Sequence, residues 1–207
     1  MENKKYQIIY ADPPWKYGFW YQSENVKRNA ADHYQVMSRE ELELLPIEKI
    51  SDKDSILLMW IIYPCLEEGL NLMKVWGFKY KTVAFTWIKK NKKSNSWFVG
   101  LGNYTRANAE ICLLGTKGRG LKRINHAVRQ IIDSPIREHS QKPEEAKIRI
   151  VELFGNLPRI ELFARQKTEG WDVWGNEVKS DIDLKEEYCQ MAEKQIKPLM
   201  AQEILGL

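Results

Sequence analysis

Hydrophobic and polar positions divide the chain into short apolar runs separated by polar loops, a pattern typical of an α/β domain. The first run, Ile8-Ile9-Tyr10-Ala11, is rich in β-branched and aromatic residues and is closed by Pro13-Pro14. A short run of this composition, stopped by prolines, predicts a buried strand that ends abruptly. Asp12 then lies at the carboxyl end of that strand, where open α/β sheets place their ligands.

Strand and helix character alternate in the next part of the chain. Residues 55–62 form a continuous apolar run typical of a central parallel strand that is covered on both faces. Apolar residues at helical spacing follow over 65–76, with Gly77 placed to end the helix, and residues 80–88 return to strand character. This alternation favours a right-handed crossover in an α/β sheet.

The second half of the chain continues the same pattern. Residues 110–114 and 159–165 predict two further strands, and residues 143–154 predict a helix between them. Ser140 is placed to act as the N-cap of that helix. We expect residues 171–177 to form the loop that follows the last strand.

The segment Asp12-Pro13-Pro14-Trp15 at the end of the first strand has a specific chemistry. Prolines lack an N–H and have a fixed φ, so the carbonyls of Asp12 and Pro13 can point into a pocket without joining a ladder. One carboxylate and one carbonyl can hold the two hydrogens of an sp² amino group and turn its lone pair towards an electrophile. The alternative is that Asp-Pro-Pro is only a turn with an Asx hydrogen bond.

This motif resembles the catalytic motif of adenine-N(6) methyltransferases that use S-adenosylmethionine. Three later motifs follow in the chain, and their order is similar to the order in the MT-A70 branch of these enzymes. They are His139-Ser140-Gln141-Lys142-Pro143, Glu161-Leu162-Phe163-Ala164-Arg165 and the run from Gly170 to Glu177. The resemblance covers nearly the whole chain. It implies a Rossmann-like, doubly wound α/β methyltransferase sheet with the permuted, beta-class motif order, formed by residues 1–178.

The resemblance also implies a cofactor, S-adenosylmethionine, and a set of site residues. It assigns catalysis to Asp12, Pro13, Pro14 and Trp15, and cofactor binding to Asp12, Pro13, His139, Ser140, Lys142, Phe163, Arg165, Asn176 and Glu177. Without the resemblance, the position of His139 and Lys142 beside the start of a helix fits two roles equally well. They could bind a phosphate or carboxylate, or they could simply cap the helix. One departure is Ala109, which stands where larger relatives place a lysine before Glu-x-Cys-Leu. No metal is implied, because a sulfonium is already an activated electrophile.

Basic residues cluster in two stretches: residues 89–106, which also contain aromatic residues, and residues 117–123, which follow the strand predicted over 110–114. Charge runs are usually solvated faces, but basic residues interleaved with aromatics beside a base pocket fit a nucleic-acid groove better. The residues predicted to contact nucleic acid are Tyr17, Trp20, Lys89, Lys90, Lys92, Lys93, Trp97, Arg106, Arg119, Lys122 and Arg123. We expect both stretches to lie on loops that leave strand ends, on the rim of one cleft.

Composition limits the remaining possibilities. A chain of 207 residues suits one domain with a full core, and a net charge of +4 permits a polyanionic partner without requiring one. Cys65, Cys112 and Cys189 are too few and too widely spaced for a zinc site or a disulfide framework. The sequence shows no signal peptide and no membrane span, so we expect a cytoplasmic protein.

The sequence therefore predicts an enzyme that methylates the exocyclic nitrogen of adenine in nucleic acid, with DNA favoured over RNA. Two alternatives stay open: an amine or amide methyltransferase that acts on protein glutamine, and a catalytically silent nucleic-acid-binding subunit of a methyltransferase complex. Asp12, the acid that such silent subunits lose, is intact. Residues 179–207 predict a C-terminal helical extension that packs on the domain or on a partner, either a second copy or another subunit.

Overall fold

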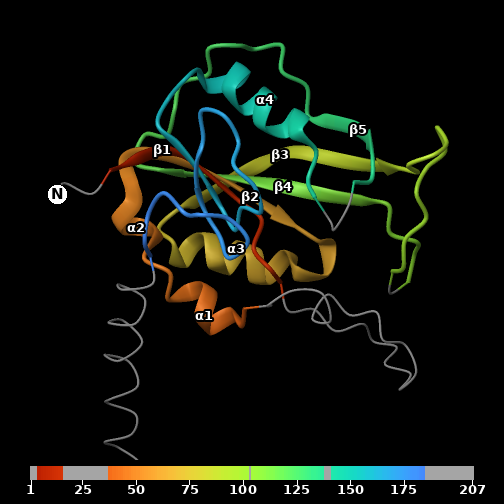
Figure 1. The fold of residues 1–207 in the computed structure, drawn as a ribbon, viewed down its shortest axis with the longest axis horizontal. Helices are drawn as coiled ribbons and strands as arrows, with labels where there is room; N and C mark the ends of the chain where they lie inside the picture. Colours follow the sequence, from red (N-terminus) through yellow and green to blue (C-terminus); the bar gives the residue numbers. More distant parts are fainter. Residues whose placement is uncertain (1–3, 16–36, 103, 138–140, 185–207) are drawn as a thin grey trace, which may run out of the picture.

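A seven-stranded sheet forms the centre of the computed structural model, which describes residues 4–15, 37–102, 104–137 and 141–184. The strands are β1 (Tyr6–Ala11), β2 (Ser51–Ile61), β3 (Lys79–Lys90), β4 (Ala109–Lys117), β5 (Ile131–Pro135), β6 (Arg159–Leu162) and β7 (Asp172–Trp174). Their order across the sheet is β5-β3-β4-β2-β1-β6-β7 (Figure 1). The strand that precedes Asp12 is therefore central, as its apolar sequence predicts.

Strand direction defines two different edges of this sheet. β1 is parallel to β2 and β6, β6 to β7, and β3 to β5, whereas β4 is antiparallel to both β2 and β3. Six of the described strands thus end at one edge, which we call the carboxyl edge, and β4 begins there. The opposite edge, where β1 begins and β4 ends, is the amino edge. Strand direction decides which loops lie near Asp12.

Helices cover both faces of the sheet. They are α1 (Arg39–Glu43), α2 (Ile47–Ile50), α3 (Leu66–Val75) and α4 (Glu144–Phe154), with a 3₁₀ turn over Tyr63–Cys65 before α3. In Figure 1, α4 lies above the sheet, and α1 and α3 lie below it. Alternate residues of β1 point to opposite faces, so Ile9 joins the core that contains Leu72 of α3, while Ile8 joins the core that contains Ile150 of α4. The predicted α/β, Rossmann-like fold is confirmed.

Several local predictions are confirmed and two are wrong. The helix predicted over 65–76 is present as α3, and Gly77 follows it with a φ of +83° that favours glycine. The helix predicted over 143–154 is α4, but its N-cap is Pro143 rather than Ser140. Residues 171–177 are not all loop, because Asp172–Trp174 pairs with β6 as β7. That strand is only three residues long, too short for a recognisable period.

After β7, residues 181–184 return to the sheet. The Asp181 carboxylate accepts a hydrogen bond of 2.9 Å from the Val173 N–H, and Leu184 is buried. The helical extension predicted over 179–207 falls mostly beyond residue 184 and lies outside the described residues. In the part of the chain that is described, no helix has the length and apolar character needed to cross a membrane.

Candidate functional site

The Asp12-Pro13-Pro14-Trp15 segment leaves β1 as a fixed turn at the carboxyl edge. The Pro13 carbonyl accepts a hydrogen bond of 2.9 Å from the Trp15 N–H, so it is engaged in the turn and not in the sheet. The Trp15 indole in turn donates to the Trp60 carbonyl at 3.1 Å. A carbonyl oxygen has a second lone pair, so the Pro13 oxygen keeps acceptor capacity in this turn. The segment ties the end of β1 to the end of β2.

Four charged side chains form one continuous network at this edge. Lys142 Nζ lies 2.8 Å from both carboxylate oxygens of Asp12 and 3.3 Å from Glu110 Oε2. Glu110 Oε1 pairs with Lys89 of β3. We call Asp12, Lys142, Glu110 and Lys89 the buried charge network, because the side chains of Glu110 and Lys142 are only 7% and 11% exposed. Residues from β1, β3, β4 and the segment before α4 meet here.

Burial and charge oppose each other in this network. Burial raises the pKa of Asp12 above its usual range, although Lys142 acts against that shift. Burial would also raise the pKa of Glu110, but the ammonium groups of Lys142 and Lys89 hold that pKa below its usual range. The two carboxylates likewise raise the pKa of Lys142 despite its burial. One ammonium ion is thus shared between two carboxyl groups of different acidity.

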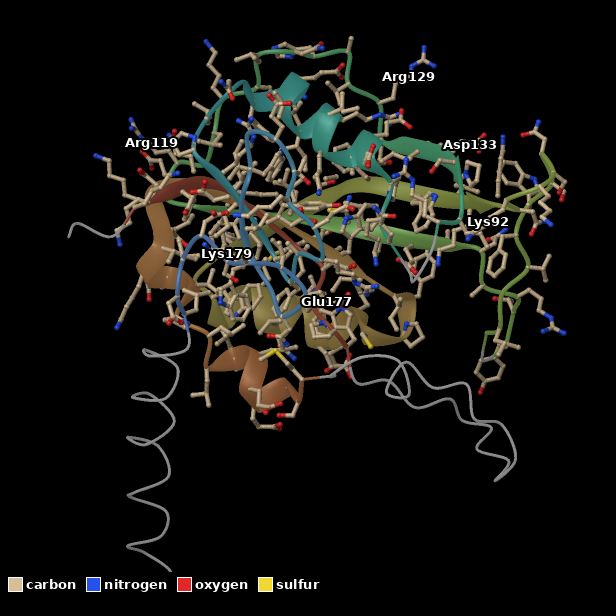
Figure 2. All side chains as sticks on the ribbon, in the orientation of Figure 1. Lys92, Arg119, Arg129, Asp133, Glu177 and Lys179 are labelled. Carbon is tan, nitrogen blue, oxygen red and sulfur yellow. The ribbon has the colours of Figure 1, made fainter. Side chains whose placement is uncertain are left out.

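A cavity of about 250 Å³ opens beside Asp12, between β1, β6 and the start of α4. Five residues that the sequence assigns to cofactor binding line it, namely Asp12, Lys142, Phe163, Arg165 and Glu177. Figure 2 shows Glu177 near the centre of the molecule, away from the ends where Arg119 and Lys92 lie. Acids, an arginine and an aromatic ring around one cavity suit a ligand with a zwitterionic end, hydroxyl groups and an apolar part.

The chain that follows β6 is held in an uncommon conformation at this cavity. Phe163 has a φ of +62°, in the left-handed region that disfavours large side chains, and its ring packs edge-on against Trp174 at 5.5 Å. A Cβ on Gly175 would come within 2.1 Å of the Ala164 carbonyl oxygen, so only glycine fits this crossing. The crossing holds Arg165 near Glu177, whose charged groups are 3.8 Å apart.

Two acids of the site are not among the residues predicted from the sequence. Glu110 stands alone among the apolar residues of β4, and a lone acid in a buried strand is the signal that could have found it. Glu161 of β6 lines the cavity and pairs with Lys147 of α4, which also donates to Thr168 at 2.8 Å. Burial raises the pKa of Glu161. Both acids face partners far away in the sequence, which no local pattern reveals.

The basic residues near the carboxyl edge divide into two kinds. Lys89 and Lys90 belong to β3 rather than to a loop, and they pair with Glu110 and Asp133. Their predicted role as loop residues facing phosphate is not supported by this placement. Beyond β3, exposed positions include four of the predicted nucleic-acid-binding residues, Lys92, Lys93, Trp97 and Arg106.

The second basic stretch lies at the other edge of the sheet, which contradicts the prediction of one shared rim. β4 runs antiparallel to β2 and ends opposite Ser55, so Arg119, Lys122 and Arg123 follow at the amino edge. Arg119 pairs with Asp54 at 2.8 Å. Figure 2 shows Arg119 and Lys92 at opposite ends of the molecule. The direction of β4, which the sequence does not encode locally, separates the two stretches.

Four predicted site residues, Tyr17, Trp20, His139 and Ser140, lie outside the described residues. Pro14 and Asn176 are described, and Asn176 follows the Gly175 crossing at the cavity. Among the residues that the structure describes, no group of His, Cys, Asp and Glu is arranged to hold a metal ion.

Comparison with known proteins adds an independent line of evidence. The MT-A70 family model matches residues 6–177. The type II methyltransferase M.MunI from Mycoplasma sp is 37% identical over 193 residues, which cover 86% of this chain and 80% of that protein. The catalytic subunit of human N(6)-adenosine-methyltransferase, METTL3, is 25% identical over 84% of this chain, and the match covers only 28% of METTL3. A probable N(6)-adenosine-methyltransferase from rice is 26% identical over 84% of this chain, and the match covers only 23% of that protein.

Proposed function

The chain belongs to the MT-A70 family, and on that basis we propose that it transfers the methyl group of S-adenosylmethionine to the exocyclic nitrogen of adenine in nucleic acid. The observation that carries the proposal is the Asp12 carboxylate at the end of β1, which borders the cavity and is held by Lys142. The similarity to the type II methyltransferase is stronger and covers more of both chains than the similarity to the adenosine methyltransferases. It therefore favours DNA over RNA.

Asp12 is suited to hold and orient the target amino group. A carboxylate oxygen has two lone pairs, so Asp12 can accept a hydrogen from the amine while it still accepts one from Lys142. The Pro13 carbonyl is the second acceptor for the amine, because it keeps a lone pair in its turn. Two acceptors fix the plane of the amino group and direct its lone pair into the cavity.

The cavity residues fit S-adenosylmethionine. Phe163 offers an apolar surface, Glu177 offers acceptors for ribose hydroxyls, and Arg165 and Lys142 offer cations for a carboxylate. Asn176, next to Glu177 in the chain, is proposed as a further ribose contact. When bound, this cofactor supplies a methyl group on a positively charged sulfur. The cavity lining holds four acids, Asp12, Glu144, Glu161 and Glu177, and three bases, Lys142, Lys147 and Arg165. This small excess of negative charge favours a cationic ligand over a neutral one. The residues of the chain thus position the amine and stabilise the charge that develops on it.

One assay tests this proposal directly. Labelled S-adenosylmethionine is offered together with matched single-stranded and duplex DNA and RNA, and the products are digested to nucleosides. We expect the label in N6-methyladenine, first in DNA. The Asp12→Asn variant, shown to be folded by its melting temperature, is the matched control and should transfer no label. Label on protein glutamine, or cofactor and nucleic-acid binding without any transfer, would support one of the two alternatives instead. We also propose that the enzyme works in the cytoplasm.

A further inference from the structure

A projecting finger, described over residues 91–102 and 104–108, leaves the carboxyl edge between β3 and β4 and extends beyond the sheet in Figure 1. Its base is held by backbone hydrogen bonds from Lys89 N to Asn108 O and from Phe98 N to Lys89 O, at 2.8 and 2.9 Å. Further out, Gly100 N donates to Ala107 O at 2.9 Å. The finger is therefore a braced element and not an open loop.

Glycines bring the two legs of the finger close together. A Cβ on Gly100 would lie 2.5 Å from the Ala107 carbonyl oxygen, and one on Gly102 would lie 1.9 Å from the Thr105 carbonyl oxygen. Real Cβ atoms do not approach backbone oxygens so closely, so a larger residue would force the legs apart. The result is a narrow tip, which matters for the space that it can enter.

The finger combines basic and apolar side chains, with lysines near its base and large exposed apolar residues at its tip, beside Arg106. Near the base, Lys90 lies 5.3 Å from the centre of the Trp97 ring, and Lys92 and Lys93 are exposed. At the tip, Leu101 and Tyr104 are 58% and 92% exposed. Large apolar side chains held out in water by a braced backbone are unfavourable unless another surface covers them.

The finger also adjoins the reacting groups. Its second leg ends two residues before Glu110, and Glu110 connects through Lys142 to Asp12. A target adenine that reaches Asp12 has to leave the stack of a duplex, which opens a gap between the neighbouring base pairs. Proteins that open such gaps commonly fill them with an apolar wedge. A narrow apolar tip, on an element whose base adjoins the buried charge network, has the shape and chemistry for this task.

We propose that the preferred substrate is a duplex, and that Leu101 and Tyr104 enter it and fill the gap left by the extruded adenine. Lys92, Lys93 and Arg106 then contact phosphates beside the opened step. This inference rests on the proposed function and adds to it the form of the substrate. A protein partner fits the finger less well, because stable protein interfaces bury about 800 Å² on each side and are poor in lysine.

The test compares three DNA substrates that differ only at the target adenine: paired in a duplex, opposite an abasic site, and single-stranded. The Leu101→Ala/Tyr104→Ala variant should lose roughly tenfold or more in methylation rate on the paired duplex, because it cannot hold the stack open. Its methylation rate should fall little on the other two substrates, where the target adenine has no pairing partner to leave. With 2-aminopurine at the target, the duplex should also show less fluorescence increase with this variant than with wild type.

Two further variants serve as controls. Tyr80→Ala removes an aromatic side chain that is 44% exposed at the amino edge, and it should leave all three rates unchanged. Tyr104→Phe keeps the apolar ring and should keep the duplex rate. Melting temperatures show whether each variant is folded.

If the double variant loses the same factor in methylation rate on all three substrates, the finger is a general binding surface, and the proposal that its tip enters the duplex is wrong. A change of oligomeric state in the double variant, measured by analytical ultracentrifugation, would assign the tip to a protein interface and also overturn it. If wild-type enzyme methylates single strands but not paired duplexes, the wedge fails while the proposed function stands. If it methylates no nucleic acid at all, the proposed function itself fails.

Discussion

The two edges of the sheet carry the same kinds of charged residues in very different surroundings. At the carboxyl edge, Lys142 is 11% exposed and sits between Asp12 and Glu110. At the amino edge, the Arg119 side chain is 88% exposed beside Asp54. Breaking a buried ion pair leaves a charge without solvent, whereas water replaces either partner of an exposed one. Burial, rather than residue type, separates a reactive group of charges from an ordinary surface pair.

The largest effect expected from this difference is on catalysis. Asp12→Asn keeps the size of the side chain but removes the charge and one acceptor, so the target amine loses its orientation. We expect the methylation rate to fall roughly a thousandfold. Asp54→Asn, the matched change at the amino edge, should leave the rate unchanged. Labelled methyl transfer measures both, and an Asp12→Asn enzyme with more than a tenth of the wild-type rate would remove Asp12 from the reaction.

Stability should show the same contrast. Lys142→Met leaves Asp12 and Glu110 as neighbouring carboxylates without their shared cation, and it should lower the free energy of unfolding by about 3 kcal/mol at neutral pH. The loss should shrink as the pH falls, because protonation neutralises both acids. Arg119→Met should change stability little. Urea denaturation of the two variants at pH 7 and pH 5 is the measurement, and equal losses would contradict the contrast.

The same lysine controls the pH dependence of the reaction. Burial raises the pKa of Asp12, the Glu110 charge raises it further, and Lys142 and Arg165 act in the opposite direction. Because the amine requires the ionised carboxylate, activity falls as the pH drops through this pKa. Removing Lys142 takes away a charge that favours ionisation, so the acid limb of the pH-rate profile should move to higher pH. An unmoved limb in Lys142→Met would show that another group sets the profile.

A smaller effect is expected at the cofactor cavity. Asn176→Ala together with Glu177→Ala removes hydrogen-bonding groups but leaves the buried charge network in place. S-adenosylmethionine binding should weaken about tenfold, and nucleic-acid binding should stay the same. Isothermal calorimetry measures the first and fluorescence anisotropy the second. Unchanged cofactor affinity would count against the assignment of these two residues.

The contrast between the edges also explains what the sequence can and cannot predict. The strand before Asp12 and helix α3 are each predicted from a local pattern of apolar residues, and the structure has both at the predicted positions. The motif with Lys142 and the segment from Phe163 to Arg165 meet at one cavity, as the family resemblance implies.

The predictions that are wrong depend on contacts between distant segments. The sequence places Arg119 after a strand end but does not show that β4 is reversed, so its loop lies at the amino edge and not beside the pocket. Four lysines follow Ile88 within five residues and resemble a basic loop, yet β3 continues through Lys89, which meets Glu110. Glu110 and Lys142 are 32 positions apart by their numbers, and only the folded sheet brings them together.

The smallest expected effect concerns nucleic-acid binding by the two basic stretches. Lys92→Ala with Lys93→Ala removes two charges from the base of the finger, and Lys122→Ala with Arg123→Ala removes two from the amino edge, so net charge changes equally. If Lys92 and Lys93 bind phosphates, removing each one should flatten the slope of log affinity against log salt by about 0.9, and by the same amount on every sequence. The second pair should leave the slope at its wild-type value. Anisotropy titrations from low to moderate salt distinguish the two, and equal slopes for both variants would mean that charge alone, rather than its place at the carboxyl edge, attracts the duplex.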